Sequence, residues 1–205
     1  MYKKPLIVFE GIEGSGKSHH ILSASKYLKS KKIDHVRIRE PGGNYNSEKI
    51  RKLILNDNLN FNSKTDLLLY MAARSENIDL IKKFYKKKVI LIDRFIDSTI
   101  AYQHYGMGVD LKIIKKINDF LLENIKVDFT FLNLVSNNNL KKRLKQRKKL
   151  NRYDKFKIHF YNKVQNGYIK LAKTKSKSYK IINSNLDIKE NEYSIIEQIK
   201  ILKII

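Results

Sequence analysis

The chain has 205 residues, 42% of them hydrophobic, which is enough for one core and predicts a single domain over residues 1–205. It contains no cysteine, which excludes a disulfide framework, a thiolate metal site and a cysteine nucleophile. A net charge of +23 would suit a nucleic-acid-binding protein, but the lysines are spread along the whole chain, so nucleic acid is not the expected partner.

An apolar run at residues 6–9 forms the first predicted element, and Glu10 ends it. The run is too short for the core of a signal peptide and far too short to span a bilayer. No other targeting or membrane segment is visible in the sequence. We therefore expect a cytoplasmic protein that does not enter a membrane.

Short apolar runs rich in Val, Ile and Phe predict five buried strands, at residues 6–9, 35–38, 89–92, 129–134 and 179–182. Helical spacing predicts helices at residues 17–28, 64–85, 111–122, 139–148, 156–173 and 192–202. Strands that alternate with helices predict an α/β fold, here an open parallel five-stranded sheet with helices on both faces. Ligands of such sheets bind at the carboxyl ends of the strands.

Residues 11–18, Gly-Ile-Glu-Gly-Ser-Gly-Lys-Ser, lie between the first strand and the first helix and match the pattern G-x-x-x-x-G-K-[ST] in full. Glycines let the backbone curl around one phosphate, and the helix adds its positive end. Lys17 offers a cation to the outer phosphates, and Ser18 offers a hydroxyl to Mg²⁺. The pattern predicts a P-loop NTPase-type fold. The predicted ATP-binding residues are Gly11, Glu13, Gly14, Ser15, Gly16, Lys17 and Ser18.

Three later features place charged or aromatic side chains near the same edge of the sheet. Residues 39–43, Arg-Glu-Pro-Gly-Gly, form a rigid charged turn after the second strand. Tyr70 and Arg74 share a helix face that could stack on and hydrogen-bond a base. Asp93 ends the third strand where a carboxylate could hold Mg²⁺ through water, and Arg94 beside it could clamp a phosphate. Taken singly, each feature also fits an ordinary turn, helix face or surface ion pair.

Residues 141–157 contain ten Lys or Arg and one acid, Asp154. A basic segment after the fourth strand could close over ATP and bring cations to the transferred phosphate. The alternative is a solvated helix face in a lysine-rich chain. The segment is predicted to be a lid.

In this order and spacing, these pieces resemble the thymidylate kinase family over residues 6–172. The family's three signatures correspond to residues 9–18, 39–43 and 93–103, the last reading Asp-Arg-Phe-Ile-Asp-Ser-Thr-Ile-Ala-Tyr-Gln. The resemblance implies phosphorylation of dTMP to dTDP by ATP, with Mg²⁺ as the cofactor. It also implies a homodimer.

The resemblance implies residue roles by position. The residues matched to dTMP binding are Glu13, Arg51, Tyr70, Arg74, Arg94, Thr99 and Gln103. Ser18 and Asp93 match the metal-binding positions. The catalytic candidates are Lys17, Arg94, Arg147 and Arg152, with Arg143 also in the lid. Gly14 stands where some members carry a catalytic Arg, so the chain resembles the bacterial type, whose catalytic Arg comes from the lid. Asn151 replaces the usual Asp, which could loosen lid closure.

Two other interpretations remain open at this stage. One is a small kinase for a different nucleotide or nucleoside, which a panel of acceptors would identify. The other is a basic nucleic-acid-binding protein that kept a triphosphate-binding loop, which predicts oligonucleotide affinity at physiological salt. A GTPase is disfavoured because the chain has no Asn-Lys-x-Asp motif.

Overall fold

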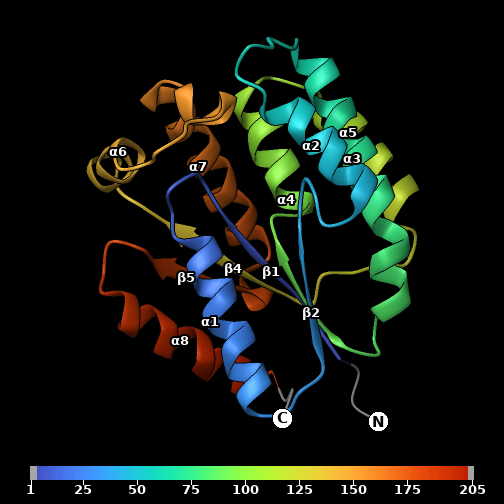
Figure 1. The fold of residues 1–205 in the computed structure, drawn as a ribbon, viewed down its shortest axis with the longest axis vertical. Coiled ribbons are helices and arrows are strands. Elements are labelled where there is room, and N and C mark those ends of the chain that lie inside the picture. The colour runs from blue at the N-terminus through green and yellow to red at the C-terminus, as the bar shows by residue number, and fades with distance from the viewer. Residues whose placement is uncertain (1–3, 203–205) are drawn as a thin grey trace.

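A parallel five-stranded sheet lies at the centre of the computed structural model, which describes residues 4–202 (Figure 1). Its strands are β1 (Leu6–Gly11), β2 (His35–Arg39), β3 (Val89–Asp93), β4 (Phe129–Leu134) and β5 (Tyr179–Asn183). They follow the order β2-β3-β1-β4-β5, and every neighbouring pair is parallel. All five predicted strands are present, and the predicted fold class is confirmed.

The connecting elements are mostly helical. They are α1 (Lys17–Ser30), α2 (Tyr45–Leu55), α3 (Ser63–Phe84), α4 (Ile96–Thr99), the π-helix η1 (Ile100–Gly106), α5 (Leu111–Leu122), α6 (Asn137–Lys145), the 3-10 helix η2 (Arg152–Lys155), α7 (Ile158–Thr174), the 3-10 helix η3 (Ser176–Ser178) and α8 (Ile188–Ile201). The six predicted helices are all present; α5 has the predicted ends, and each of the others differs at one or both ends. The prediction missed α2 and the continuous α4–η1 segment.

The sheet is covered on both faces by apolar side chains that alternate along the strands. In β1, Ile7 and Phe9 pack in a cluster with α1 and α8, whereas Leu6 and Val8 pack in a cluster with α3 and the end of α5. This alternation follows the two-residue period of a strand. The outer strands β2 and β5 are only partly buried, so the expectation of fully buried strands fails at both edges of the sheet.

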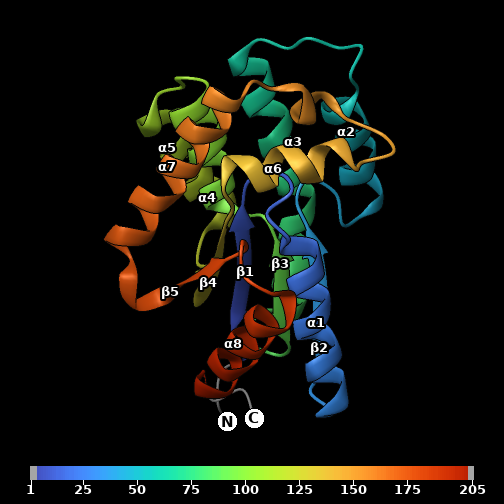
Figure 2. The ribbon, with the colours of Figure 1, turned by 90° about the vertical axis from the view of Figure 1, so that its left-hand side faces the viewer.

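The carboxyl ends of β1, β2 and β3 lie at the end of the sheet where α2, α6 and the upper part of α7 stand in both views of the ribbon (Figures 1 and 2). The phosphate loop follows β1, the turn at residues 39–43 follows β2, and Arg94 follows β3. The predicted lid, residues 141–157, consists of most of α6, a loop and η2. The topology therefore gathers the three signatures and the lid at one edge. Within residues 4–202, no helix combines the length and apolar character needed to cross a bilayer.

Candidate active site

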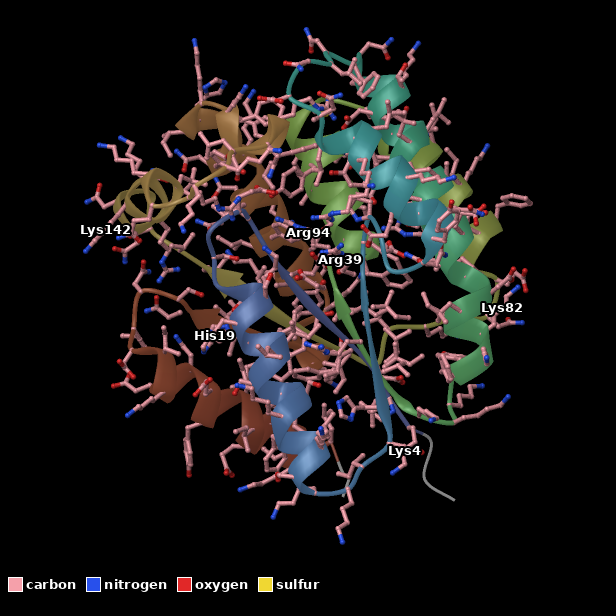
Figure 3. The ribbon with its side chains drawn as sticks, viewed as in Figure 1. Lys4, His19, Arg39, Lys82, Arg94 and Lys142 are labelled. Carbon is pink, nitrogen blue, oxygen red and sulfur yellow. The ribbon has the colours of Figure 1, made fainter. Side chains whose placement is uncertain are left out.

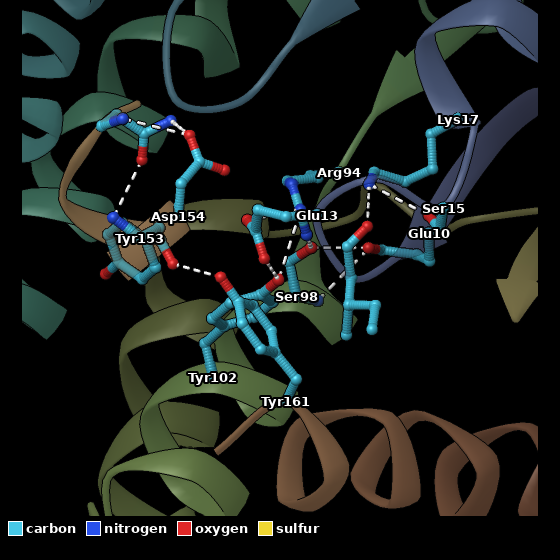
Figure 4. Close-up of polar contacts among 12 residues, drawn as sticks. Glu10, Glu13, Ser15, Lys17, Arg94, Ser98, Tyr102, Tyr153, Asp154 and Tyr161 are labelled. Atoms are coloured by element: carbon cyan, nitrogen blue, oxygen red, sulfur yellow. Dashed lines mark hydrogen bonds and ion pairs between the residues drawn. The ribbon is translucent and has the colours of Figure 1, made fainter. Parts of the chain in front are cut away.

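The phosphate loop is shaped by its glycines. Gly14 and Gly16 have φ of 65° and 89°, values that residues other than glycine rarely adopt, and Gly16 leads directly into α1. Lys17 is buried, and its Nζ donates to the carbonyl oxygen of Ile12 at 2.8 Å and to Ser15 Oγ at 3.4 Å (Figure 4). Burial, and then the nearby charge of Arg94, lowers the pKa of Lys17 to about 8. The ammonium is therefore held inside the loop that it would serve.

Ser18 and Asp93 meet at the start of α1 and the end of β3. The hydroxyl of Ser18 donates to Oδ2 of Asp93 at 3.0 Å, and both side chains border one cavity. A hydroxyl and a carboxylate are hard oxygen donors of the kind that Mg²⁺ prefers. No group of three or more His, Asp or Glu side chains in residues 4–202 could cage a metal by itself. The pair fits an ion that is also held by substrate phosphates.

Arg94 is the central cation of the site. Its backbone has φ of 67°, which turns the side chain back over the phosphate loop. Nη2 lies 2.8 Å from Glu13 Oε1 and 3.3 Å from the hydroxyl of Tyr102, and the Tyr102 hydroxyl itself donates to the other carboxylate oxygen of Glu13 (Figure 4). Nη1 lies 3.3 Å from the hydroxyl of Tyr168. These contacts fix the guanidinium at the mouth of the loop.

A buried carboxylate beneath Arg94 holds this part of the chain in place. Glu10, at the end of β1, accepts hydrogen bonds from the backbone N–H groups of Phe95 and Ser98 at 2.8 and 3.2 Å. It also accepts from the hydroxyls of Ser98 and Tyr168 at 2.5 and 3.0 Å. Burial, and then the charge of Asp97, raises the pKa of Glu10. Glu10 thus joins β1 to the start of α4 and fixes the turn that carries Arg94.

Two cavities flank the phosphate loop. The first, of about 180 Å³, is rich in arginine and is bordered among others by Arg39, Arg51, Tyr70, Arg94 and Tyr153. The second, of about 350 Å³, lies over the loop glycines and reaches Arg143, Ser184, Leu186 and Ile188. Lys17, Ser18 and Arg147 border both cavities. A phosphoryl group could therefore pass from one cavity to the other across these three side chains.

The first cavity is suited to an anion. Arg51 is half-buried and donates to the carbonyl oxygen of Pro41 at 2.6 Å, and burial lowers its pKa. Arg39 pairs with Glu48 at 2.8 Å, and it lies near Arg94 at the centre of the molecule (Figure 3). With Arg94 and Arg147, four guanidinium groups thus border one small space, and such groups bind phosphate in a fork geometry.

The predicted base-binding residues are brought together only in part. Tyr70 and Gln103 border one small cavity of about 20 Å³ with Glu13 and Arg94. Arg74 is fully buried instead. Its Nε donates to Glu40 and its Nη1 donates to Asn118, each at 2.7 Å, and it borders none of these cavities. Thr99 is also buried outside them, and its hydroxyl has no hydrogen-bond partner in residues 4–202. The roles of Arg74 and Thr99 stay predictions.

The lid arginines differ from one another in position. Arg147 forms an ion pair with Asp154 and borders both cavities. Arg143 donates to the carbonyl oxygens of Gly14 and Ser184 at 2.8 and 2.6 Å, which ties α6 to the phosphate loop. Arg152 donates to the carbonyl oxygen of Ile54 at 3.0 Å and forms an ion pair with Asp66, away from both cavities.

Asn151 has a local structural role at the start of η2. Its side-chain oxygen accepts from the backbone N–H of Tyr153 at 2.8 Å. Its own backbone N–H and Nδ2 donate to Asp154 Oδ2 at 3.0 and 2.7 Å, which makes a reciprocal cap. An amide therefore meets the capping requirement at this position.

Several site residues were missed from the sequence. Tyr102 precedes Gln103 in the third signature, so its position beside a predicted base-binding residue could have identified it. Tyr168 lies 74 positions after Arg94, so no local pattern could have linked the two. Tyr153 lies in the predicted lid, to which the sequence assigned a role only through its basic side chains.

Comparisons with known proteins agree with this geometry. The family model described as thymidylate kinase matches residues 9–195. The chain is 39% identical to the thymidylate kinase of Thermosipho africanus, with 94% of this chain and 96% of that protein covered. It is 37% identical to that of Clostridium novyi, with 90% and 93% covered. Among solved structures it is similar to the thymidylate kinase of Ehrlichia chaffeensis, with a TM-score of 0.77, 30% identity, and 97% and 99% of the two chains covered.

Proposed function

The chain belongs to the thymidylate kinase family, and from that premise we propose that it transfers the terminal phosphate of ATP to dTMP, which yields dTDP and ADP. The observation that carries the proposal is the pair of cavities that share Lys17, Ser18 and Arg147. One cavity is built on the phosphate loop and suits the donor. The other is lined by arginines and suits the phosphate of an acceptor.

The reaction needs little covalent help from the protein. A phosphate oxygen of dTMP, already anionic near neutral pH, attacks the terminal phosphorus of ATP, and the bond from that phosphorus to the bridging oxygen of ADP breaks. Positioning and charge stabilisation supply most of the catalysis. Arg51 and Arg94 aim the acceptor phosphate, Lys17 holds the donor phosphates, and Arg147 neutralises charge that develops between them. Arg152, which borders neither cavity, supports the lid.

Ser18 and Asp93 would hold Mg²⁺ beside the phosphate loop, on the strength of their 3.0 Å contact. When bound, the ion neutralises the negative charge of the donor phosphates. The backbone N–H groups of Gly16, Lys17 and Ser18, at the start of α1, would contact the same phosphates.

The thymine ring would lie against Tyr70 with its edge toward Gln103, since both side chains border the small cavity next to Arg94. That cavity, at about 20 Å³, is too small for a ring, so the aromatic side chains around it must move apart on binding. Burial raises the pKa of Tyr70, so its phenol is neutral at physiological pH and its ring is available for stacking.

The proposal extends to a single domain over residues 1–205 that works in the cytoplasm as a homodimer. Apolar side chains on α3 and α5 support the dimer: Leu68, Ile113 and Phe120 are 58%, 51% and 80% exposed. Two copies that pair through this face would bury them.

The test is ADP release from ATP and Mg²⁺, with dTMP, dUMP, dCMP, dGMP, dAMP and thymidine offered separately. We expect turnover with dTMP and weaker turnover with dUMP. Turnover with a different acceptor would assign the chain another substrate. No turnover with any of them, in protein shown to be folded by circular dichroism, would reject the kinase and leave only a triphosphate-binding loop.

A further inference from the structure

Asp66 lies in the first turn of α3 with no exposed surface, and side chains from two other segments of the chain donate to it. Arg152 of the lid forms an ion pair with Oδ1. Tyr153 of the lid and Gln103 of η1 both donate to Oδ2, at 2.5 and 3.0 Å. An ionised carboxylate only accepts hydrogen bonds, so it can hold all three donors at once.

This arrangement dictates which end of the Gln103 side chain faces the cavity. Its Nε2 donates to Asp66 Oδ2 at 3.0 Å and lies 3.5 Å from the hydroxyl oxygen of Tyr153. A carboxylate cannot accept from the carbonyl end of an amide, so the opposite orientation would set two acceptors against each other. The hydrogen bonds of the Gln103 side chain within residues 4–202 all run through Nε2, and Gln103 borders the small cavity beside Tyr70. The amide therefore offers its oxygen, an acceptor, to whatever base enters.

We propose that Asp66 is a specificity-determining positioning residue, which fixes the Gln103 amide so that the site accepts a pyrimidine with a ring N–H donor and rejects one with a ring acceptor. The proposal rests on the proposed function and deepens it. Thymine and uracil carry N–H at ring position 3, whereas cytosine carries an unprotonated nitrogen there. The acceptor oxygen of Gln103 can take a hydrogen bond from thymine or uracil, whereas with cytosine it would face another acceptor.

The substitution Asp66→Asn would invert this preference because Arg152 decides how the new amide lies. The guanidinium has only donors, so the oxygen of the introduced amide must take the place of Oδ1. The introduced NH₂ group then stands where Oδ2 stood, facing Gln103 and Tyr153. Gln103 would turn its oxygen toward this new donor and its NH₂ toward the base. The site would then offer a donor, which suits cytosine and opposes thymine.

The experiment compares kcat/KM for dTMP and dCMP in the wild-type chain, in Asp66→Asn and in Tyr153→Phe. We expect the ratio of dTMP to dCMP to fall about 10- to 100-fold in Asp66→Asn. Tyr153→Phe is the matched control: it removes the other donor to the same oxygen and the longer contact at 3.5 Å to Gln103, but it keeps the 3.0 Å hydrogen bond from Gln103 to Asp66, so its ratio should stay close to the wild-type value. A role in stability alone would lower both activities together and leave the ratio unchanged, which would overturn the proposal.

A double variant that exchanges the carboxylate and the amide between the two positions should restore the preference for dTMP. In Asp66→Asn combined with Gln103→Glu, the new carboxylate accepts from the amide introduced on α3 and still offers an acceptor to the base, so the preference for dTMP should return. Continued loss of the preference would contradict the assignment.

If Asp66→Asn fails to fold, the orientation of the Gln103 amide can still be tested in the wild-type chain. In its dTMP complex, nuclear Overhauser contacts are expected between the Nε2 protons of Gln103 and the ring protons of Tyr153. Their absence would show that the amide points the other way. A wild-type chain that turns over no nucleotide at all would instead reject the proposed function, so the two failures can be told apart.

Discussion

A guanidinium nitrogen of Arg94 lies 2.8 Å from a carboxylate oxygen of Glu13, and this ion pair joins the end of β3 to the phosphate loop. The two side chains are 16% and 11% exposed, so the pair is shielded from solvent yet opens onto the arginine-rich cavity. An acceptor phosphate that displaces Glu13 would meet a guanidinium already in position.

Replacement of Arg94 by Ala is expected to lower kcat/KM for dTMP by about 100- to 1000-fold, the loss typical when one positioned donor is removed. Arg37→Ala is the matched control, since Arg37 is exposed on β2 and borders neither cavity. Initial rates at several dTMP concentrations measure the effect. Near-normal turnover in Arg94→Ala would remove this residue from the site.

The affinity for ATP is expected to depend on pH through Lys17. Burial lowers the pKa of Lys17 to about 8 in the ligand-free chain, so the ammonium loses its proton as the pH rises through that value. Phosphates bind the charged form, so affinity should be constant below about pH 7 and fall by up to about tenfold per pH unit above 8. Calorimetric titration between pH 6.5 and 9.5 tests this. Lys17→Arg keeps its charge and should lose the dependence; the same slope in both proteins would assign the titration to another group.

Alanine substitutions of Arg147 and Arg152 are expected to differ in their main effect, which is on kcat for Arg147 and on the free energy of unfolding for Arg152. Arg147 is 36% exposed and borders both cavities, so Arg147→Ala should lower kcat about 100-fold. Its pair with the buried Asp154 is more open to solvent than the pair of Arg152, which is 11% exposed, with Asp66, so the free energy of unfolding should fall by less than in Arg152→Ala. Arg152→Ala should lower the free energy of unfolding by about 3 kcal/mol, because Asp66 would remain buried without its cation. Urea denaturation and steady-state rates separate the two effects. A stable but inactive Arg152→Ala would reverse the assignment.

Gly167→Ala in α7 is expected to destabilise the chain by about 1–3 kcal/mol, although alanine favours helices. A Cβ atom at this position would lie 2.5 Å from the ring of Tyr105 in η1, far inside the contact distance. Asn166→Ala, at the preceding exposed position, has no such neighbour and should be neutral or slightly stabilising. Urea midpoints for both variants measure the difference. Equal midpoints would show that α7 and η1 can move apart freely.

The strands β1, β3 and β4 were predictable because each is a run rich in Val, Ile, Leu or Phe between polar turns, whereas β2 and β5 gave a weaker signal, since charged residues interrupt them. The helix α2 was missed because its start, with Asn44, Asn46 and Ser47, has the composition of a turn, while Asn44 in fact caps the helix. The α4–η1 segment contains Ile96, Thr99 and Ile100, whose branched side chains disfavour a helix locally. Its packing against α7 outweighs that preference, and such packing cannot be read from a local window.

The site was predictable where its residues lie in short motifs. Lys17, Ser18, Asp93 and Arg94 stand together as the motifs imply. What the sequence could not supply is the partner of each charge. Arg74 and Arg152 both have motif positions, but buried acids from other segments of the chain hold them outside the cavities. Such pairs span 34 and 86 positions, and only the folded chain brings them into contact.

The half-buried edges of the sheet also affect how the protein behaves when it is concentrated. An open strand edge can pair with the same edge of another copy and start aggregation. At β2, the exposed Arg37 side chains of two copies would come close to each other across such a junction, whereas Arg39 is paired with Glu48. Repulsion between the Arg37 side chains opposes edge-to-edge stacking, and the positive charge of the whole chain adds to it. The sheet can therefore end in an open strand and still resist growth into fibres.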